Sequence, residues 1–228
     1  MKEFTRLEWL IGTDFEKLRN AKVLVLGLGG VGGYVVEALA RSGVGTLILV
    51  DYDTVDITNC NRQIIATNEV LGQEKTKAFE ARIHSISKDC KVISMNEKIE
   101  VATIDRLFIY EPDFIVDACD TIPVKCECIK ACLERKIPFI SSMGTANKLD
   151  PTKLEIVDIR KTSYDPIAKI VRNYVKKEKL KGRIPVVCST ESPKKIDGKL
   201  GTIITVPAVC GMYLAHYTIQ TLIKGENQ

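Results

Sequence analysis

The residues with the clearest chemical meaning lie in a glycine-rich turn and in the acidic residue that follows it. Gly27, Gly29 and Gly32 form a Gly-x-Gly-x-x-Gly pattern that also contains Gly30. Such a turn, placed before a helix, lets backbone amides and the helix N-terminus approach a phosphate closely. Asp51 follows roughly 20 residues later, a spacing that suits a carboxylate reaching ribose hydroxyls. The pattern predicts a nucleotide site.

A second group of polar residues indicates that the phosphates are themselves attacked. This group comprises Asp53, then Asn59, Arg62 and Gln63, and finally Lys75. A dehydrogenase needs no cations there, because its chemistry takes place at the nicotinamide. Two cations can neutralise the charge that builds up at the α-phosphorus when a carboxylate attacks and pyrophosphate leaves. Any one of these residues alone would most often be a surface charge, so the prediction depends on the ordered set.

The composition narrows the class of protein further. At 228 residues the chain can form one large α/β domain or one and a half smaller ones. No apolar run approaches the roughly 18 residues of a membrane span, and the N-terminus lacks a signal-peptide layout. We therefore expect a cytoplasmic protein without membrane contact. The eight cysteines contain no Cys-x-x-Cys pair, so we expect reduced thiols rather than disulfides or a zinc ribbon.

Apolar runs alternate with helical periodicity along the first half, which predicts an α/β fold with a Rossmann-like, doubly wound, mostly parallel sheet. Expected strands cover 22–26, 46–50, 91–95, 114–116 and 138–141, and expected helices cover 34–41, 74–87, 101–110 and 123–135. A C-terminal extension adds strands at 154–159 and 184–188, a helix beginning at Asp165-Pro166, a loop at 192–201 and a helix at 206–223. We expect one domain over 1–228, with a nucleotide-binding half (1–142) and a substrate-side half (143–228).

With these motifs in place, residues 6–142 resemble the adenylating domain of the ubiquitin-activating superfamily. That superfamily includes the sulfur-carrier adenylyltransferases of molybdopterin and thiamine synthesis. The resemblance is carried by the glycine turn, Asp51-Tyr52-Asp53, the segment 59–63, Lys75 and Asp117-Ala118-Cys119-Asp120. The second half resembles the tRNA threonylcarbamoyladenosine dehydratase branch, through Met143-Gly144, Lys148 to Thr152, Asp158, Lys161-Thr162, Asp165 to Ala168 and Val187 to Glu191.

The resemblance implies a Mg-ATP site and assigns roles within it. Asp51 would hold the ribose, Arg62 and Lys75 would bind the triphosphate, and Asn59 and Gln63 would support them. Asp120, just after the strand at 114–116, would bind Mg2+, a hard cation that accepts few protein oxygens beside phosphate. Arg6 aligns with an arginine that reaches the phosphates of the neighbouring subunit, which implies a homodimer. Its surrounding motif is short, so an ordinary surface arginine is an equal alternative.

The implied reaction is ATP-dependent adenylation of the threonine carboxylate of threonylcarbamoyladenosine in tRNA, followed by ring closure with net loss of water. Superfamily members that activate proteins carry a catalytic cysteine, but 144–187 contains none and Cys188 comes only after it. Because the substrate carries its own nucleophile, no enzymic thiol is required. One alternative is an adenylyltransferase for a ubiquitin-like sulfur carrier, and another is a nucleotide-sensing scaffold without turnover. A sulfurtransferase-type protein partner stays open.

A tRNA substrate requires basic surface, and the helix after Asp165-Pro166 offers a candidate. Lys169, Arg172, Lys176 and Lys179 fall within about one quarter of a helix circumference at 100° per residue. Ile167, Ile170, Val171 and Tyr174 lie on the other side. This pattern predicts a basic stripe that binds RNA, with an ordinary solvated helix face as the alternative.

Overall fold

One seven-stranded sheet runs through the computed structural model, which describes residues 3–225. The strand order is β3-β2-β1-β4-β5-β7-β6. The strands are β1 (Lys22–Leu26), β2 (Thr46–Asp51), β3 (Lys91–Asn96), β4 (Phe114–Asp117), β5 (Phe139–Ser142), β6 (Leu154–Asp158) and β7 (Pro185–Ser189). All neighbours pair in parallel except β6, which is antiparallel to β7. This confirms the predicted doubly wound α/β class, and the C-terminal strands join the same sheet.

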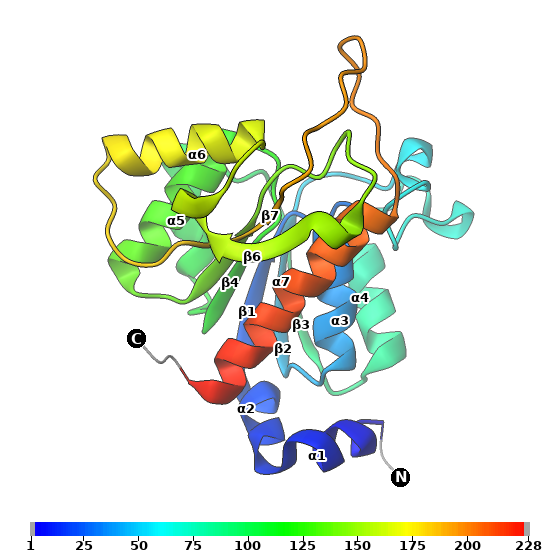
Figure 1. Ribbon diagram of the computed structural model, residues 1–228. Coiled ribbons are helices and arrows are strands. Elements are labelled where there is room, and N and C mark those ends of the chain that lie inside the picture. The colour runs from blue at the N-terminus through cyan, green and yellow to red at the C-terminus, as the bar shows by residue number, and fades with distance from the viewer. Residues whose placement is uncertain (1–2, 226–228) are drawn as a thin grey trace.

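Helices cover both faces of this sheet (Figure 1). They are α1 (Thr5–Ile11), α2 (Phe15–Asn20), α3 (Gly32–Arg41), α4 (Lys75–Ile86), α5 (Ile122–Arg135), α6 (Pro166–Lys177) and α7 (Thr205–Lys224). Alternate strand residues serve the two faces: Val23 belongs to one buried cluster, and Leu24 to the other. The first cluster contains residues of α3, α4 and α7, and the second contains residues of α5 and α6. Because both faces of the sheet are covered, successive strand residues are buried on alternate faces. This explains the nearly continuous apolar runs in the sequence.

Four elements differ from the sequence-based expectation. The segment Val101–Phe108 is a kinked 3-10 helix, with Thr103 outside helical geometry, rather than a regular helix. Helices α1 and α2 were not predicted, because helices of 7 and 6 residues are too short to show a clear periodicity. The helix α6 ends at Lys177, so Lys179 lies beyond it. The loop expected at 192–201 and the closing helix are confirmed.

The topology brings distant polar segments to a single edge. The parallel strands β1, β2 and β4 end at Leu26, Asp51 and Asp117, and carboxyl ends of parallel strands share an edge. The glycine turn, the acidic pair and the loop with Asp120 therefore meet there. Among residues 3–225, no helix is long and apolar enough to cross a membrane.

Candidate nucleotide site

The glycine turn between β1 and α3 has a backbone that side chains would block. Gly27 has φ 88°, and a Cβ there would lie 2.9 Å from the Ala118 carbonyl oxygen. A Cβ on Gly32 would lie 1.8 Å from the Gly27 carbonyl oxygen. In the described chain, the amides of Gly29 and Gly30 donate no hydrogen bond. The turn thus presents open N–H groups at the start of α3, the arrangement that binds phosphate.

Asp51 and Lys75 form the buried floor of the site. The Asp51 carboxylate accepts hydrogen bonds from the Leu28 amide at 2.6 Å and the Asp53 amide at 2.9 Å. Lys75 Nζ lies 2.8 Å from Asp53 Oδ2 and 3.9 Å from Asp51 Oδ1, and its side chain is 5% exposed. The Lys75 amide also donates to the Asp53 carbonyl at 3.0 Å. The structure therefore brings the predicted ribose carboxylate and one predicted phosphate cation together.

Arg62 lies against the glycine turn. A Cβ on Gly30 would meet Arg62 Cγ at 3.3 Å, so the arginine stem packs directly over this glycine. The guanidinium donates to the Thr58 carbonyl at 2.8 Å and to Asn61 Oδ1 at 2.9 Å. Asn59 has a structural role, because its Oδ1 accepts from the Asp56 amide at 3.1 Å and closes a capping box. These three hydrogen bonds hold the segment that positions the Arg62 guanidinium.

Gln63 places a buried side-chain oxygen without a partner in residues 3–225 next to the glycine turn. Its side chain is 7% exposed, and Oε1 has no hydrogen-bond partner among the described residues. A Cβ on Gly29 would lie 3.9 Å from Gln63 Nε2, so the amide faces the glycine turn. A buried polar atom without a partner is costly unless a ligand or water satisfies it.

Asp120 is exposed in the β4–α5 loop and makes no hydrogen bond or ion pair with any described residue. The charge of Asp120 is felt at Tyr52, the residue between Asp51 and Asp53. The pKa of Tyr52 is raised first by the charge of Asp53, then by burial and by the charge of Asp120. Asp120 thus lies within electrostatic reach of the acidic pair, as the sequence predicted. Its carboxylate is free for a cation.

A buried network under this loop was missed by sequence reasoning. Lys125 Nζ donates to Asp117 Oδ2 at 2.7 Å and to Ser141 Oγ at 3.2 Å, while Ser141 Oγ donates to the same carboxylate oxygen at 2.6 Å. Asp117 Oδ1 accepts from the Cys119 amide at 3.1 Å. Burial alone would lower the pKa of Lys125, but the Asp117 carboxylate outweighs it and raises that pKa. The network fixes the loop that carries Asp120. The sequence signal for this network was Lys125 itself, a lysine on the apolar face of a helix.

The residues present fit a Mg-bound nucleoside triphosphate. The open amides and the unpaired Gln63 oxygen are matched by phosphate and ribose groups, and Asp51 stands at the strand end where ribose is held. Magnesium is held in such sites by one or two carboxylates together with phosphate oxygens and water. A single free carboxylate at Asp120 meets that need. The described residues contain no group of three or more His, Cys, Asp or Glu that could hold a metal by itself.

Arg6 lies apart from this site within the chain. It is exposed on α1, which precedes α2 and β1 and therefore lies at the amino end of the sheet (Figure 1). The site lies at the carboxyl edge. The structure thus does not bring Arg6 to the nucleotide site of its own chain, and a role at a partner's site stays a prediction.

The basic stripe is only partly a helix face. Lys169 and Lys176 are exposed on α6, but Arg172 is half-buried and donates to the Thr162 carbonyl at 3.0 Å as well as to its hydroxyl. Lys179 has φ 52°, so its prediction as a helix residue is wrong: the chain turns back there, and Leu180 packs on the core. Ile170, predicted on the apolar side, is 48% exposed.

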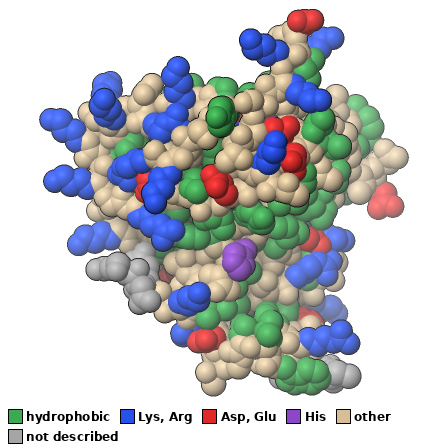
Figure 2. Space-filling view, in the orientation of Figure 1, with side chains coloured by type: hydrophobic (Ala, Val, Ile, Leu, Met, Phe, Trp, Pro, Cys, Tyr) green, Lys and Arg blue, Asp and Glu red, His purple; other side chains and the backbone are tan. Residues whose placement is uncertain are grey.

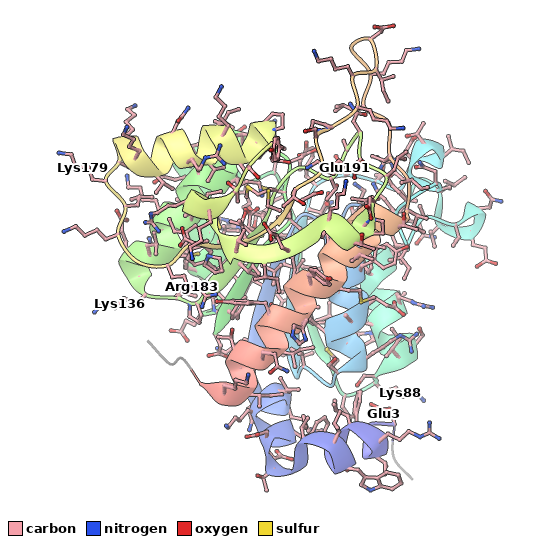
Figure 3. All side chains as sticks on the ribbon, viewed as in Figure 1. Glu3, Lys88, Lys136, Lys179, Arg183 and Glu191 are labelled. Carbon is pink, nitrogen blue, oxygen red and sulfur yellow. The ribbon has the colours of Figure 1, made fainter. Side chains whose placement is uncertain are left out.

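The end of α6 nevertheless forms a basic groove with a volume of about 510 Å3. Its lining includes Arg160, Arg172, Lys176 and Lys179, together with Asn173, Val175 and Leu180. Lys and Arg side chains gather over this end of the molecule, where Lys179 projects outward (Figures 2 and 3). We call these seven residues the basic groove. Four of the lining residues are cations and none is an acid, although Arg160 also pairs with Asp158 at 3.1 Å, so the groove carries positive charge that attracts anions.

The cysteines are free thiols, mostly buried. Burial, followed by the charge of Asp165, raises the pKa of Cys188 to about 12. Burial also raises the pKa of Cys210 to about 12. A thiol with such a pKa is protonated near neutral pH and is a poor nucleophile. This agrees with the expectation that the reaction requires no enzymic thiol.

The fold and the site define an adenylating protein of the ThiF family, to which the chain belongs: the family model matches residues 5–228. The chain is 42% identical to a tRNA threonylcarbamoyladenosine dehydratase of Bacillus subtilis, over 98% of this chain and 96% of that protein. It is 33% identical to the Escherichia coli protein of the same name, over 76% of this chain and 67% of that one. The resemblance drawn from the sequence is confirmed.

Solved structures agree with this assignment. The E. coli tRNA N6-threonylcarbamoyladenosine dehydratase in complex with ATP has a TM-score of 0.91 and 29% identity, covering 97% of this chain and 94% of that chain. The same enzyme in complex with AMP gives the same values. A molybdopterin-synthase adenylyltransferase of E. coli is 32% identical over 66% of this chain.

Proposed function

We propose that this protein is an ATP-dependent tRNA threonylcarbamoyladenosine dehydratase. It adenylates the threonine carboxylate of threonylcarbamoyladenosine in tRNA and closes a ring with net loss of water. The observation that carries the proposal is the meeting of open glycine amides, Arg62, Lys75 and Asp120 at one sheet edge. The 42% identity to a dehydratase over nearly the full chain supports the choice of substrate.

The residues have separate tasks in this reaction. The glycine turn and the α3 N-terminus bind phosphates, while Asp51 orients the ribose. As the carboxylate attacks the α-phosphorus, Arg62 and Lys75 stabilise the added negative charge and pyrophosphate leaves. A nucleophile already in the substrate then attacks the activated carbonyl carbon, and AMP leaves with one former carboxylate oxygen. Ring closure within one molecule gains a high effective concentration, so no thiol is needed.

Magnesium belongs to the proposal as the cofactor held by Asp120. When bound, it supplies positive charge to the phosphates. Lys75 Nζ pairs with Asp53 at 2.8 Å, and because the Asp53 side chain is 49% exposed, Lys75 can exchange this partner for a phosphate oxygen without leaving Asp53 buried and unpaired. The Asp117–Lys125 network keeps the Asp120 loop in place during this exchange.

The second candidate is an adenylyltransferase for a ubiquitin-like sulfur carrier, favoured by the 32% identity to such an enzyme over 66% of this chain. That reading would need a protein partner with a C-terminal Gly-Gly. The raised pKa of Cys188 and the absence of cysteine from 144–187 favour the dehydratase. A nucleotide-sensing scaffold would have no need for Arg62, Lys75 and Asp120 at one edge.

Homodimer formation, a cytoplasmic location and a sulfurtransferase-type partner are further parts of the proposal. In a dimer Arg6 would contact the nucleotide of the partner, since it lies away from the nucleotide site of its own chain. If the site is shared, mixing inactive Arg6→Ala and Lys75→Ala subunits restores partial activity, because one site of each hybrid dimer is intact. Subunits that exchange without any restored activity would contradict the shared site.

The function is tested by mass analysis of nucleosides from tRNA incubated with the protein, ATP and Mg2+. The proposal predicts that threonylcarbamoyladenosine loses the mass of one water and that AMP and pyrophosphate appear. Omitting ATP should leave the nucleoside unchanged. An unchanged nucleoside, together with adenylation of a sulfur-carrier C-terminus, would favour the second candidate.

A further inference from the structure

The most prominent surface element outside the nucleotide site is the loop that joins β7 to α7. We call residues 190–204 the projecting loop. It rises above the carboxyl edge of the sheet, and its tip stands clear of the rest of the molecule (Figures 1 and 2). It contains no helix or strand. The side chains at its tip belong neither to the adenylation site nor to the buried core.

The base of the projecting loop is held firmly, so its position is not arbitrary. Asn147, in a left-handed conformation with φ 60°, makes four hydrogen bonds to it. Its carbonyl accepts from the Lys194 amide at 2.7 Å, and its amide donates to the Gly201 carbonyl at 2.7 Å. Its side chain accepts from the Gly201 amide at 2.6 Å and donates to the Lys199 carbonyl at 3.3 Å. One asparagine thus joins both arms of the loop.

Two further contacts connect the loop to the site edge. Asn61 Nδ2 donates to the Thr202 carbonyl at 3.2 Å, while Asn61 Oδ1 accepts from Arg62. At the other arm, the Glu191 carboxylate accepts from the Leu149 and Asp150 amides (Figure 3). The loop therefore shares a hydrogen-bonded support with the arginine predicted to bind phosphate. These contacts fix the base of the loop at the edge of the sheet where the site lies, and the tip projects from that base (Figure 1).

The tip combines positive charge with uncovered apolar side chains. Three lysines, Lys194, Lys195 and Lys199, stand against one acid, Asp197, and all four are outside the core. Leu200 is 82% exposed and Ile196 is 42% exposed. Lysines of this kind bind a phosphate backbone, and apolar side chains pack on bases that are turned out of a stack. The excess of lysines over acids at the tip favours a polyanion as the occupant.

We propose that the projecting loop binds the substrate tRNA next to the adenosine that reacts, with its lysines on phosphates and Leu200 against a base. This inference rests on the proposed function. It assigns to RNA a surface separate from the basic groove, which lies at the C-terminal end of α6 (Figure 3). The loop holds the RNA near the reacting nucleoside, and the groove binds it at a distance.

The first test compares tRNA binding by two triple variants. Changing Lys194, Lys195 and Lys199 to Ala should weaken binding by about tenfold or more at low salt and reduce the slope of log K against log salt by about 2. A matched variant with Lys88, Lys91 and Lys224 changed to Ala, all exposed and away from the loop, should behave as the parent. Affinity for ATP should be the same in all three proteins. A loop variant with the parent's affinity and slope overturns the inference.

The second test locates the RNA. A photo-reactive benzoylphenylalanine replacing Leu200 should cross-link to tRNA beside the modified adenosine. A cross-link only to a second copy of the chain, or to a distant part of the tRNA, overturns the inference. Asn147→Gly retains the left-handed backbone and its two backbone bonds but removes the two side-chain bonds, so it should loosen the loop and raise KM for tRNA more than it lowers kcat. If the parent protein removes no water from its tRNA, the proposed function fails first; if it does, these results judge the loop alone.

Discussion

The two halves of the molecule use charged side chains in opposite ways. In the nucleotide-binding half, Lys75 and Lys125 are buried and lie 2.8 and 2.7 Å from their carboxylate partners. In the C-terminal half, the basic residues of α6 and of the projecting loop are mostly exposed. The exception is the buried pair Lys148–Asp165 at 2.6 Å, which joins the loop after β5 to the start of α6.

The comparison indicates that the charged side chains of the nucleotide-binding half need one fixed geometry, whereas those of the C-terminal half can adapt to what they bind. A buried, paired charge has one geometry, and removing its partner leaves an uncompensated charge in a medium of low dielectric constant. An exposed charge is worth little singly, and salt screens it. Adenylation requires cations at fixed places around one phosphorus, whereas binding a large polyanion can be shared among many lysines.

The largest expected effect comes from breaking a buried pair. Lys125→Ala should lower the free energy of unfolding by about 3–5 kcal/mol, because Asp117 is left buried without its ammonium partner. Lys130→Ala on the same helix removes a side chain that is 30% exposed and should cost well under half as much. Denaturant unfolding checks both. Equal, small losses would show that the Asp117–Lys125 network does not support the site edge.

The next largest effect separates chemistry from stability. Asp120→Asn should retain the parent's unfolding midpoint, since Asp120 has no partner among residues 3–225, but should slow AMP formation by about 100-fold or more. The amide cannot offset the charge of Mg2+. Glu134→Gln, an exposed carboxylate on α5, serves as the control. Near-normal AMP formation by Asp120→Asn would remove Asp120 from the metal site.

A smaller, salt-dependent effect is expected on the other half. Changing Lys169 and Lys176 to Ala should flatten the salt dependence of tRNA binding by a slope of about 1.5, with ATP affinity unchanged. Arg172 is left intact because its bonds to Thr162 support the fold. Binding measured from low to moderate salt gives the slope. If this variant shows the parent's salt slope, the outer face of α6 does not contact tRNA and is an ordinary solvated surface.

The smallest effect is expected at Cys188. Cys188→Ser should keep most of the dehydratase activity and an unchanged pH profile between about pH 7 and pH 9, because a thiol with a pKa of about 12 stays protonated over that range. Steady-state rates across this range check it. A well-folded but inactive variant, or an acyl-thioester trapped on the parent protein, would support the sulfur-carrier reading instead.

The strands and the nucleotide site could be predicted because their signals are local. Buried parallel strands appear as short apolar runs, and the site residues follow the ends of those runs, as with Asp51 after β2. The rule that parallel strands share a carboxyl edge then placed Asp120 beside Asp51 without any structure.

What could not be predicted depends on contacts between distant segments. Lys125 stands out in the sequence as a lysine on the apolar face of a helix, but its partners Asp117 and Ser141 come from β4 and β5 and are found only in the fold. The end of α6 is set by Leu180 packing on the core, so spacing alone extended the helix to Lys179. The support of the projecting loop comes from Asn147 and Asn61, which are remote in sequence and carry no motif of their own.

The central claim is that the substrate carboxylate attacks the α-phosphorus of ATP, and an oxygen label tests it most directly. A tRNA whose threonylcarbamoyl carboxylate carries oxygen-18 is incubated with the protein and unlabelled ATP until the nucleoside has lost water. Adenylation predicts that one labelled oxygen appears in AMP, because that oxygen bridges carbon and phosphorus before the ring closes. Label in inorganic phosphate, with ADP as the other product, would mean attack at the γ-phosphorus and would contradict the account.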